Sequence, residues 1–579
     1  MYTSGTTLCS SNSLLIVACT QNSLVSDIQQ LREVIYQVRI MVREEKERRE
    51  LTLLELLKEV GEFLLYQRIV LLVAFLMLIP ANYQIFLMYF STITPSWKCS
   101  NPTISNFGNK TNNQSRCTFG NILPNSDYRR CSIPRNEWQY TESNDFSLVT
   151  RFAIDCEKEW LLHLLNSMVF VGFIIGSVAL GWIADKKGRK YVIYPSLVAI
   201  LTLGLASSFS TKISLIVICR GLIGFGFPGV YIQGILLVNE LIGGKYRAIA
   251  GLTLLCTMPV ACCILTLKAY LTKSWRMLSI ICSAPYFVLL FSYPLLPESL
   301  PWLMARDKTD DVSKIARKIG SWNGQKLPDQ FLLVRRSDQS EVGKTNILDV
   351  IGGYKNCLKL LKLAALWASI CLGFYGVTIA ADDLGGTIYR DFLIISVIEL
   401  PVRVISGPAC NRFGRKKSVL VPLLCCGIAL TAVAFIPTDM KTARLAIGII
   451  GKLSITIVAG TIYTWSLELY PVSVRSRMLG VFQVFGRVGA ASAPWVTKGL
   501  KHFGAGYGFI VMAVMALVAC GMGTQLPDTN AAVDADHLDK ESIEQGKRES
   551  EKEKEAIGVL VGVKDEEVIE LISDETVPV

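Results

Sequence analysis

The chain has 579 residues, of which 51% are hydrophobic and only 18% charged, so it is more apolar than a soluble protein of this length needs to be. A single globular core could not bury about a dozen helices that are apolar on every face, which argues against a soluble fold. The net charge of +11 does not require a nucleic-acid partner. The basic residues lie in short loops on one side of the predicted spans, as the positive-inside bias expects.

Residues 1–65 are polar and form a predicted cytosolic N-terminal segment. They show no basic flank followed by a short apolar stretch and a cleavage site, so we expect no signal peptide and assign the signal-anchor role to the first span. The stretch Leu53 to Leu65 has helical periodicity and is predicted to lie along the inner membrane surface. A solvated tail is an equally good interpretation of the residues before Leu51.

Twelve apolar stretches follow, each near the roughly 20 residues that a helix needs to cross a bilayer core of ~30 Å. They predict an all-α integral membrane protein with twelve transmembrane helices in two pseudo-symmetric six-helix bundles, residues 66–301 and 361–526. A cytosolic linker, residues 302–360, joins the bundles, and residues 527–579 are predicted to be a disordered cytosolic tail. The stretches are Ile69 to Phe90, Leu161 to Ile183, Tyr191 to Ser210, Ile213 to Leu241, Ala248 to Leu271, Met277 to Leu296, Leu363 to Ala381, Phe392 to Ala409, Val419 to Ile436, Leu445 to Leu467, Met478 to Leu500 and Gly506 to Met522.

Residues 91–160 form one long loop between the first two spans, which we predict to be extracellular. It holds two glycosylation acceptor sequences, at Asn109 and Asn113. Its four cysteines are predicted to form disulfides in an oxidising compartment, although four cysteines allow three pairings. Together with the basic loops, these signals place both termini in the cytosol. The cysteines are Cys99, Cys117, Cys131 and Cys156.

A loop signature occurs twice, at Gly181 to Lys190 after the second span and at Gly407 to Lys416 after the eighth. One copy alone would be an ordinary turn with a glycine helix stop and basic residues near lipid headgroups. Two copies in equivalent positions indicate the internal repeat of a duplicated transporter, whose substrate site lies near the midplane between the halves. We expect Asp185 to pair with the first copy's cations, whereas the neutral Asn411 predicts a weaker second latch. The other candidate latch residues are Gly188, Arg189, Gly414 and Arg415.

Three further motifs accompany these loops: Glu59 to Phe63, Pro297 to Leu303 and Glu468 to Arg475. With them, the chain resembles the organic ion transporter family of the major facilitator superfamily, which comprises organic cation and organic anion carriers, from about Leu57 to Asp528. The resemblance implies a multi-pass plasma-membrane carrier and adds Glu298, Glu468 and Arg475 to the gating candidates. The chain departs from the family pattern at Pro301, Asn411 and Leu526 to Thr529.

Ionisable residues at membrane depth are functional candidates because they are costly unless they are paired or line a wet cavity. Arg403 and Arg487 are permanent cations suited to a carboxylate or sulfonate. By resemblance, they match positions where organic anion carriers hold a basic residue, which favours an anionic substrate. Glu399 lies four residues before Arg403 and is placed to neutralise it. Lys452 and Glu240 add charge of both signs, and Arg220 is expected to brace the bundle, against Asp185 or Glu240.

Aromatic side chains are predicted to form the rest of the cavity, because flat rings bind drug-sized aromatic substrates. The candidates are Trp367, Phe374 and Tyr375 in the seventh span, with Tyr83 and Phe86 in the first. Phe374 and Tyr375 match an aromatic pair of the organic anion carriers. The alternative is that these rings only pack helices together or form an interfacial belt.

No enzyme is expected. Gly343 to Thr345 lacks the first glycine of a phosphate loop, and three histidines without a ligand pattern give no metal site, so we expect no metal and no cofactor. Transport would then draw on substrate or counter-ion gradients through alternating access. Two alternatives stay open: a cation or zwitterion carrier that uses Glu240 or Glu399, and a receptor that binds ligand without moving it. Predicted partners are a small organic ion, lipid, a counter-ion, and a scaffolding domain that binds Val577 to Val579.

Overall fold

The structure is a computed structural model of the whole chain, and it describes residues 49–99, 138–154, 156–328, 331–333, 353–384, 387–470, 474–504 and 506–528. The predicted glycosylation sites Asn109 and Asn113, Cys117 and Cys131, the Gly343 to Thr345 stretch and the tail after Asp528 lie outside these ranges. Cys156 is disulfide-bonded, and the pairing of the four loop cysteines stays a prediction.

Helices account for most of the described chain, and they provide the twelve predicted spans. Because a helix satisfies its backbone hydrogen bonds internally, it is the form in which an apolar segment can cross a bilayer. Ten are long and apolar enough to span a membrane. The spans are α3 (Leu65–Ser91), α6 (Trp160–Lys187), α7 (Arg189–Ser208), α8 (Ile213–Leu241), α9 (Gly244–Leu255) with α10 (Thr257–Thr272), α11 (Trp275–Leu290), α15 (Tyr354–Ile379), α16 (Ile388–Phe413), α17 (Arg415–Phe435), α18 (Lys441–Glu468), α19 (Arg475–Thr497) and α20 (Tyr507–Thr524).

The predicted single helix from Ala248 to Leu271 is in fact broken into α9 and α10 at Cys256. Pro259 explains the break, because a proline ring clashes with the carbonyl four residues earlier, here that of Leu255, and supplies no N–H to it. The two remaining spans are α19 and α11. Helix α19 is less apolar than the ten and begins with Arg475, and α11 is shorter, with 16 residues.

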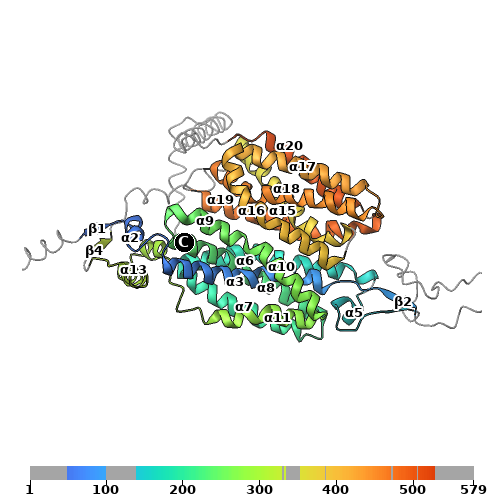
Figure 1. Cartoon of the computed structure of the whole chain (residues 1–579), viewed down its shortest axis with the longest axis horizontal. Coiled ribbons are helices and arrows are strands. Elements are labelled where there is room, and N and C mark those ends of the chain that lie inside the picture. Colours follow the sequence, from blue (N-terminus) through green and yellow to red (C-terminus); the bar gives the residue numbers. More distant parts are fainter. Residues whose placement is uncertain are drawn as a thin grey trace, which may run out of the picture.

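The helices form two groups, which Figure 1 shows one above the other: α3 to α11 in blue to green and α15 to α20 in yellow to red. Helix α6 packs against α19, and α10 packs against α16, so these pairs join the groups. The outer faces carry exposed apolar side chains such as Val178, Val421 and Ile428, as expected of surfaces that face lipid. The predicted fold class, an all-α membrane protein of two six-helix bundles, is confirmed.

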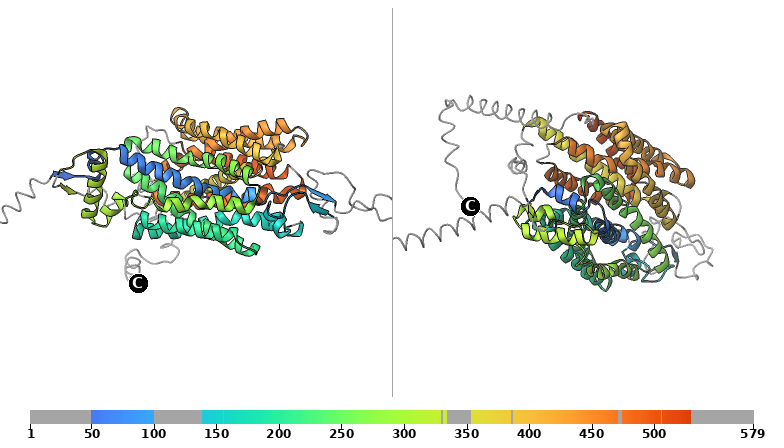
Figure 2. Two further views of the ribbon diagram at one scale, coloured as in Figure 1. Left: turned by 60° about the horizontal axis from the view of Figure 1, so that its bottom comes forward. Right: turned by 60° about the vertical axis from the view of Figure 1, so that its left-hand side comes forward.

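Small elements lie at the two ends of the bundle (Figure 2). At one end, β1 (Arg49–Leu51) pairs in parallel with β4 (Phe331–Leu333), next to α2 (Leu53–Glu59), α12 (Leu300–Ala305) and α13 (Thr309–Asn323). At the other end, β2 (Trp97–Cys99) pairs antiparallel with β3 (Trp138–Tyr140), near α5 (Leu148–Phe152). The described residues also form short 3-10 helices: η3 (Cys156–Lys158), η5 (Ala381–Leu384) and η6 (Gly499–Phe503).

The first part of the linker contains helix α13, which docks on the first span. The Asn323 side chain donates to the Val60 carbonyl at 2.7 Å and to Gln67 Oε1 at 3.0 Å, and it accepts from the Tyr66 N–H at 2.9 Å. The predicted surface helix from Leu53 is one short helix that ends at Glu59, with a capping box between Thr52 and Glu55.

Candidate functional site

Three buried charges meet where α16 faces α18. Arg403 donates to Glu399 Oε1 from Nε at 3.0 Å and from Nη2 at 2.8 Å, across one turn of α16. Lys452 of α18 lies 3.4 Å from Glu399 Oε2. One carboxylate is therefore shared by two cations, and the predicted neutralisation of Arg403 by Glu399 is present.

Phe374 of α15 covers both cations of this triad. Its ring centroid lies 3.5 Å from Lys452 Nζ and 5.3 Å from the Arg403 guanidinium carbon. Lys452 also donates to Thr378 Oγ1 at 2.8 Å and to the Phe374 carbonyl at 3.2 Å. These contacts fully occupy the ammonium group of Lys452 with protein partners.

Arg487 of α19 is in a different position, because its nearest partners are aromatic. It donates to the Tyr375 hydroxyl at 2.8 Å, and its guanidinium carbon lies 4.1 Å from the centroid of Phe173 on α6. Its side chain is buried, and its Nε has no hydrogen-bond partner among the described residues. Within the same residues, no carboxylate lies within salt-bridge distance of Arg487. A buried guanidinium with an unused donor is suited to receive an anion.

We call Phe374, Tyr375, Glu399, Arg403, Lys452 and Arg487 the central cluster. Its three cations and single carboxylate leave a net charge of two positives. Burial of such an excess is costly unless a counter-ion or water compensates it. The positive excess of the central cluster therefore calls for a compensating negative charge or for water.

The first half contributes aromatic residues that the sequence did not single out. Phe173 contacts Arg487, and Phe170 packs on Tyr375 with ring centroids 4.9 Å apart. No charge or motif marks these residues. They were identifiable only as apolar positions on helices that face the other half.

Two predicted site residues lie elsewhere. Trp367 is fully buried inside the second half, stacked on Phe482 and packed edge-on against Tyr463, so it contributes packing to that half. The prediction that Arg220 braces the bundle against Asp185 or Glu240 has the wrong partner. The Arg220 guanidinium instead donates to the side chain and backbone carbonyl of Gln84, which braces α8 against α3.

The first loop signature is clamped within its own half. Arg189 pairs with Asp185 and approaches Glu240 at 3.6 Å, while its backbone N–H donates to Glu298 Oε1 at 2.7 Å. Gly188 is required here, since its φ is +109° and an added Cβ would lie 2.4 Å from Glu298 Oε2. The motif Pro297 to Leu303 thus provides the carboxylate that holds the turn.

The second signature repeats this arrangement with different residues. Arg415 donates to Glu468 at 3.1 Å and to the Asn411 amide oxygen at 2.7 Å, and Gly414 has a φ of +86°. Arg475 donates to the Tyr470 carbonyl at 2.9 Å. Asn411 therefore occupies the place of Asp185 as an acceptor, but without its charge.

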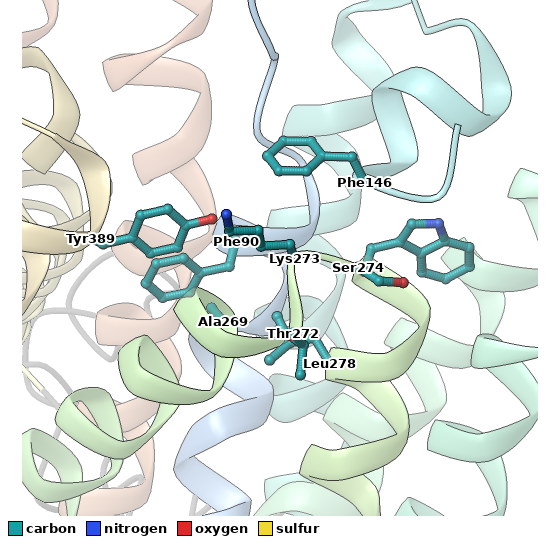
Figure 3. A pocket seen from close by; sticks show the side chains of 9 residues that line it. Phe90, Phe146, Ala269, Thr272, Lys273, Ser274, Leu278 and Tyr389 are labelled. Atoms are coloured by element: carbon teal, nitrogen blue, oxygen red, sulfur yellow. The ribbon is translucent and has the colours of Figure 1, made fainter. Parts of the chain in front are cut away.

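The halves meet chiefly at the end that carries β2 and β3. The Tyr89 hydroxyl lies 3.4 Å from Asp382 of η5, and Phe90 of α3 stacks on Tyr389 of α16. A small pocket at this seam (Figure 3) is lined by Phe90, Tyr389 and Lys273 among others, but its volume of about 10 Å³ holds only about one water. The described parts of the two halves are therefore in contact at this end.

The sequence matches the family described as "Sugar (and other) transporter" over residues 117–369 and 390–576. Similar proteins include "Solute carrier family 22 member 13" of Homo sapiens, 29% identical over 395 residues that cover 68% of this chain and 71% of that protein. "Solute carrier family 22 member 3" of Rattus norvegicus is 27% identical over the same shares. "Organic cation transporter protein" of Drosophila melanogaster is 28% identical over 433 residues, 72% of this chain and 79% of that protein.

Among solved structures, the xylose transporter XylE from E. coli in its inward open conformation aligns with a TM-score of 0.57 at 14% identity, and the alignment covers 82% of this chain and 99% of that one. At that identity, the likeness shows the fold alone.

Proposed function

Because the chain belongs to the sugar (and other) transporter family, and is therefore a multi-pass secondary transporter of the major facilitator superfamily and not an enzyme, we propose that its substrates are small organic anions. The observation that carries this proposal is Arg487, a buried guanidinium without a carboxylate partner in the described chain. The plasma membrane as its location, with both termini in the cytosol, is part of the same proposal.

The geometry gives the two arginines different roles. Arg403 is already neutralised by Glu399, so an incoming carboxylate would have to displace that contact, whereas Arg487 requires no such displacement. We infer that Arg487 binds the substrate anion first and that Arg403 and Lys452 set the positive field around it. Phe173 and Tyr375, which contact Arg487 from opposite halves, would flank an aromatic or aliphatic body.

Arg487 of the second half contacts Phe173 of the first half. Substrate binding at Arg487 would therefore change a contact that joins the two halves. Alternating access requires such a link, since the halves rock around a central site. A bound anion that draws the Arg487 guanidinium away from the Phe173 ring would weaken this contact between the halves and favour rearrangement.

The test is uptake of a radiolabelled organic anion by cells that express Arg487→Ala, Arg487→Lys or Arg403→Ala. We expect Arg487→Ala to abolish uptake, with about a hundredfold loss for an Arg–carboxylate contact in a buried site, and Arg487→Lys to restore only part of it. Arg151→Ala, at an exposed arginine of α5, is the matched control and should transport normally. Surface biotinylation gives the amount of each variant at the membrane.

Two outcomes would contradict the proposal. Saturable uptake of a quaternary amine that does not depend on Arg487 would identify a cation or zwitterion carrier, with Glu399 or Glu240 as the counter-charge. Saturable binding of the anion to the purified chain without flux in proteoliposomes would identify a receptor.

A further inference from the structure

An open groove of about 540 Å³ runs along the outer face of the first half, between α7 and the residues that follow α11. Apart from one cation, Lys190, its lining is aromatic or aliphatic and includes Tyr191, Tyr194, Pro195, Val198 and Tyr293. Tyr191, Val198 and Tyr293 are exposed. Contact of such an apolar groove with water would be unfavourable in free energy. On a membrane-spanning surface, lipid covers such a groove.

The groove has a charged end and an apolar end. Lys190 Nζ lies 3.7 Å from the ring centroid of Tyr293, and Lys187 Nζ lies 4.9 Å from that of Tyr191 and 3.4 Å from its hydroxyl. In the part of the chain that the structure describes, neither Lys187 nor Lys190 forms a salt bridge. Two ammonium groups held on aromatic rings at the rim are therefore available to an anion.

We propose that this groove binds one anionic glycerophospholipid, with its phosphate between Lys187 and Lys190 and one acyl chain along Tyr194, Pro195 and Val198. The length of the groove fits this occupant. From Lys190 to Ala199, α7 rises ~14 Å at 1.5 Å per residue. One leaflet of a hydrocarbon core of ~30 Å is ~15 Å deep, so the groove spans one acyl chain.

The groove lies beside the first loop signature, so a bound lipid would also affect the turn in that signature. The backbone N–H groups of Arg189 and Lys190 both donate to Glu298, so the helix start that carries Lys190 is also the turn that Glu298 holds. A lipid bound to Lys190 would stabilise this turn from the outside. Helix α7 packs on α6, α8 and α11 of its own half, and none of the groove residues belongs to the central cluster.

The experiment is native mass spectrometry of the full purified chain after addition of phosphatidylserine or phosphatidylcholine. We expect the wild type to retain one phosphatidylserine in preference to phosphatidylcholine. The double substitution Lys187→Gln with Lys190→Gln should reduce phosphatidylserine occupancy about tenfold, because two lysines at a membrane surface each add attraction for an anionic headgroup. Lys417→Gln with Lys441→Gln removes the same charge at two other exposed lysines and should leave occupancy unchanged.

A second variant tests the apolar end independently. Val198→Trp fills the groove without a change in charge and should also displace the retained phosphatidylserine. Equal retention of the two lipids by the wild type would overturn the proposal, as would undiminished occupancy in Val198→Trp or in the double lysine variant. Thermal unfolding of each variant checks that it is folded. If the double lysine variant is unfolded, the comparison of phosphatidylserine with phosphatidylcholine on the wild type tests the proposal instead. Since no transport substrate is used, a negative result here leaves the proposed function unaffected.

Discussion

Glu399 determines how the charges of the central cluster are balanced. Its i,i+4 spacing from Arg403 was visible in the sequence, because that spacing places two residues on the same helix face. Its second contact, with Lys452, was not visible, because the two residues lie on different spans and only helix packing brings them within 3.4 Å. The same limit applies to Arg487 and Phe173: the arginine was identified by its charge, whereas its aromatic neighbour from the other half carries no such mark.

Substitution Glu399→Gln should therefore destabilise the protein. It leaves Arg403 and Lys452 buried without a carboxylate, and loss of one partner of a buried ion pair costs about 3–5 kcal/mol. We expect a lower unfolding temperature for the purified chain and less protein at the cell surface. The measurement is thermal unfolding in detergent, followed by tryptophan fluorescence.

The control is the double variant Glu399→Gln with Lys452→Met, which restores the wild-type net charge of this triad. It should recover most of the lost thermal stability, because only Arg403 is then without its partner. A double variant no more stable than Glu399→Gln alone would show that charge imbalance is not the cause.

At the scale of elements, the length of the apolar stretches predicted the spans well. It did not predict the structure of the polar segments between them. About twenty consecutive apolar residues have few stable forms other than a membrane helix, so the spans followed from composition. Helix α13 has no such signal. It is joined to the first span by Asn323, whose hydrogen-bond partners lie more than 250 residues away, in α3 and just before it. The break at Cys256 had a local cause in Pro259, but the continuous apolar run around it concealed the boundary.

Asn323→Ala should release α13 from the first span. The variant loses three hydrogen bonds and leaves part-buried backbone and amide groups without partners, each of which costs about 1–3 kcal/mol. We expect faster amide hydrogen exchange in Thr309 to Asn323 while exchange in α15 to α20 stays unchanged. Ser321→Ala, at an exposed position of the same helix, is the matched control. Equal exchange rates in α13 for wild type and Asn323→Ala would mean that other contacts hold the helix.

At the scale of the molecule, the two halves are in contact at the end that carries β2 and β3. A charged group at this end joins η5 to the end of α19: Lys498 lies 2.6 Å from Asp382 and 3.0 Å from Asp383, and Lys501 lies 2.6 Å from Asp383. Tyr89 of the first half contacts the same Asp382. None of these residues was singled out from the sequence, because their partners are more than 100 residues apart and belong to turns between spans.

The contacts of Asp383 with Lys498 and Lys501 predict how the thermal stability of the protein depends on pH. Burial alone would raise the pKa of the Asp383 carboxyl, but the Lys498 and Lys501 ammonium groups outweigh it and hold that pKa below its usual range. A carboxyl with a depressed pKa contributes stability that is complete above its unfolded value of about 4 and is lost as the pH falls toward the folded value. We therefore expect the difference in unfolding temperature between wild type and Asp383→Asn to be constant from about pH 7 to pH 5 and to shrink below about pH 4. Thermal unfolding across this range measures it, with Asp439→Asn, at an exposed aspartate between α17 and α18, as the control. A difference that persists undiminished at about pH 3 would show that Asp383 acts through its shape or hydrogen bonds rather than through its charge.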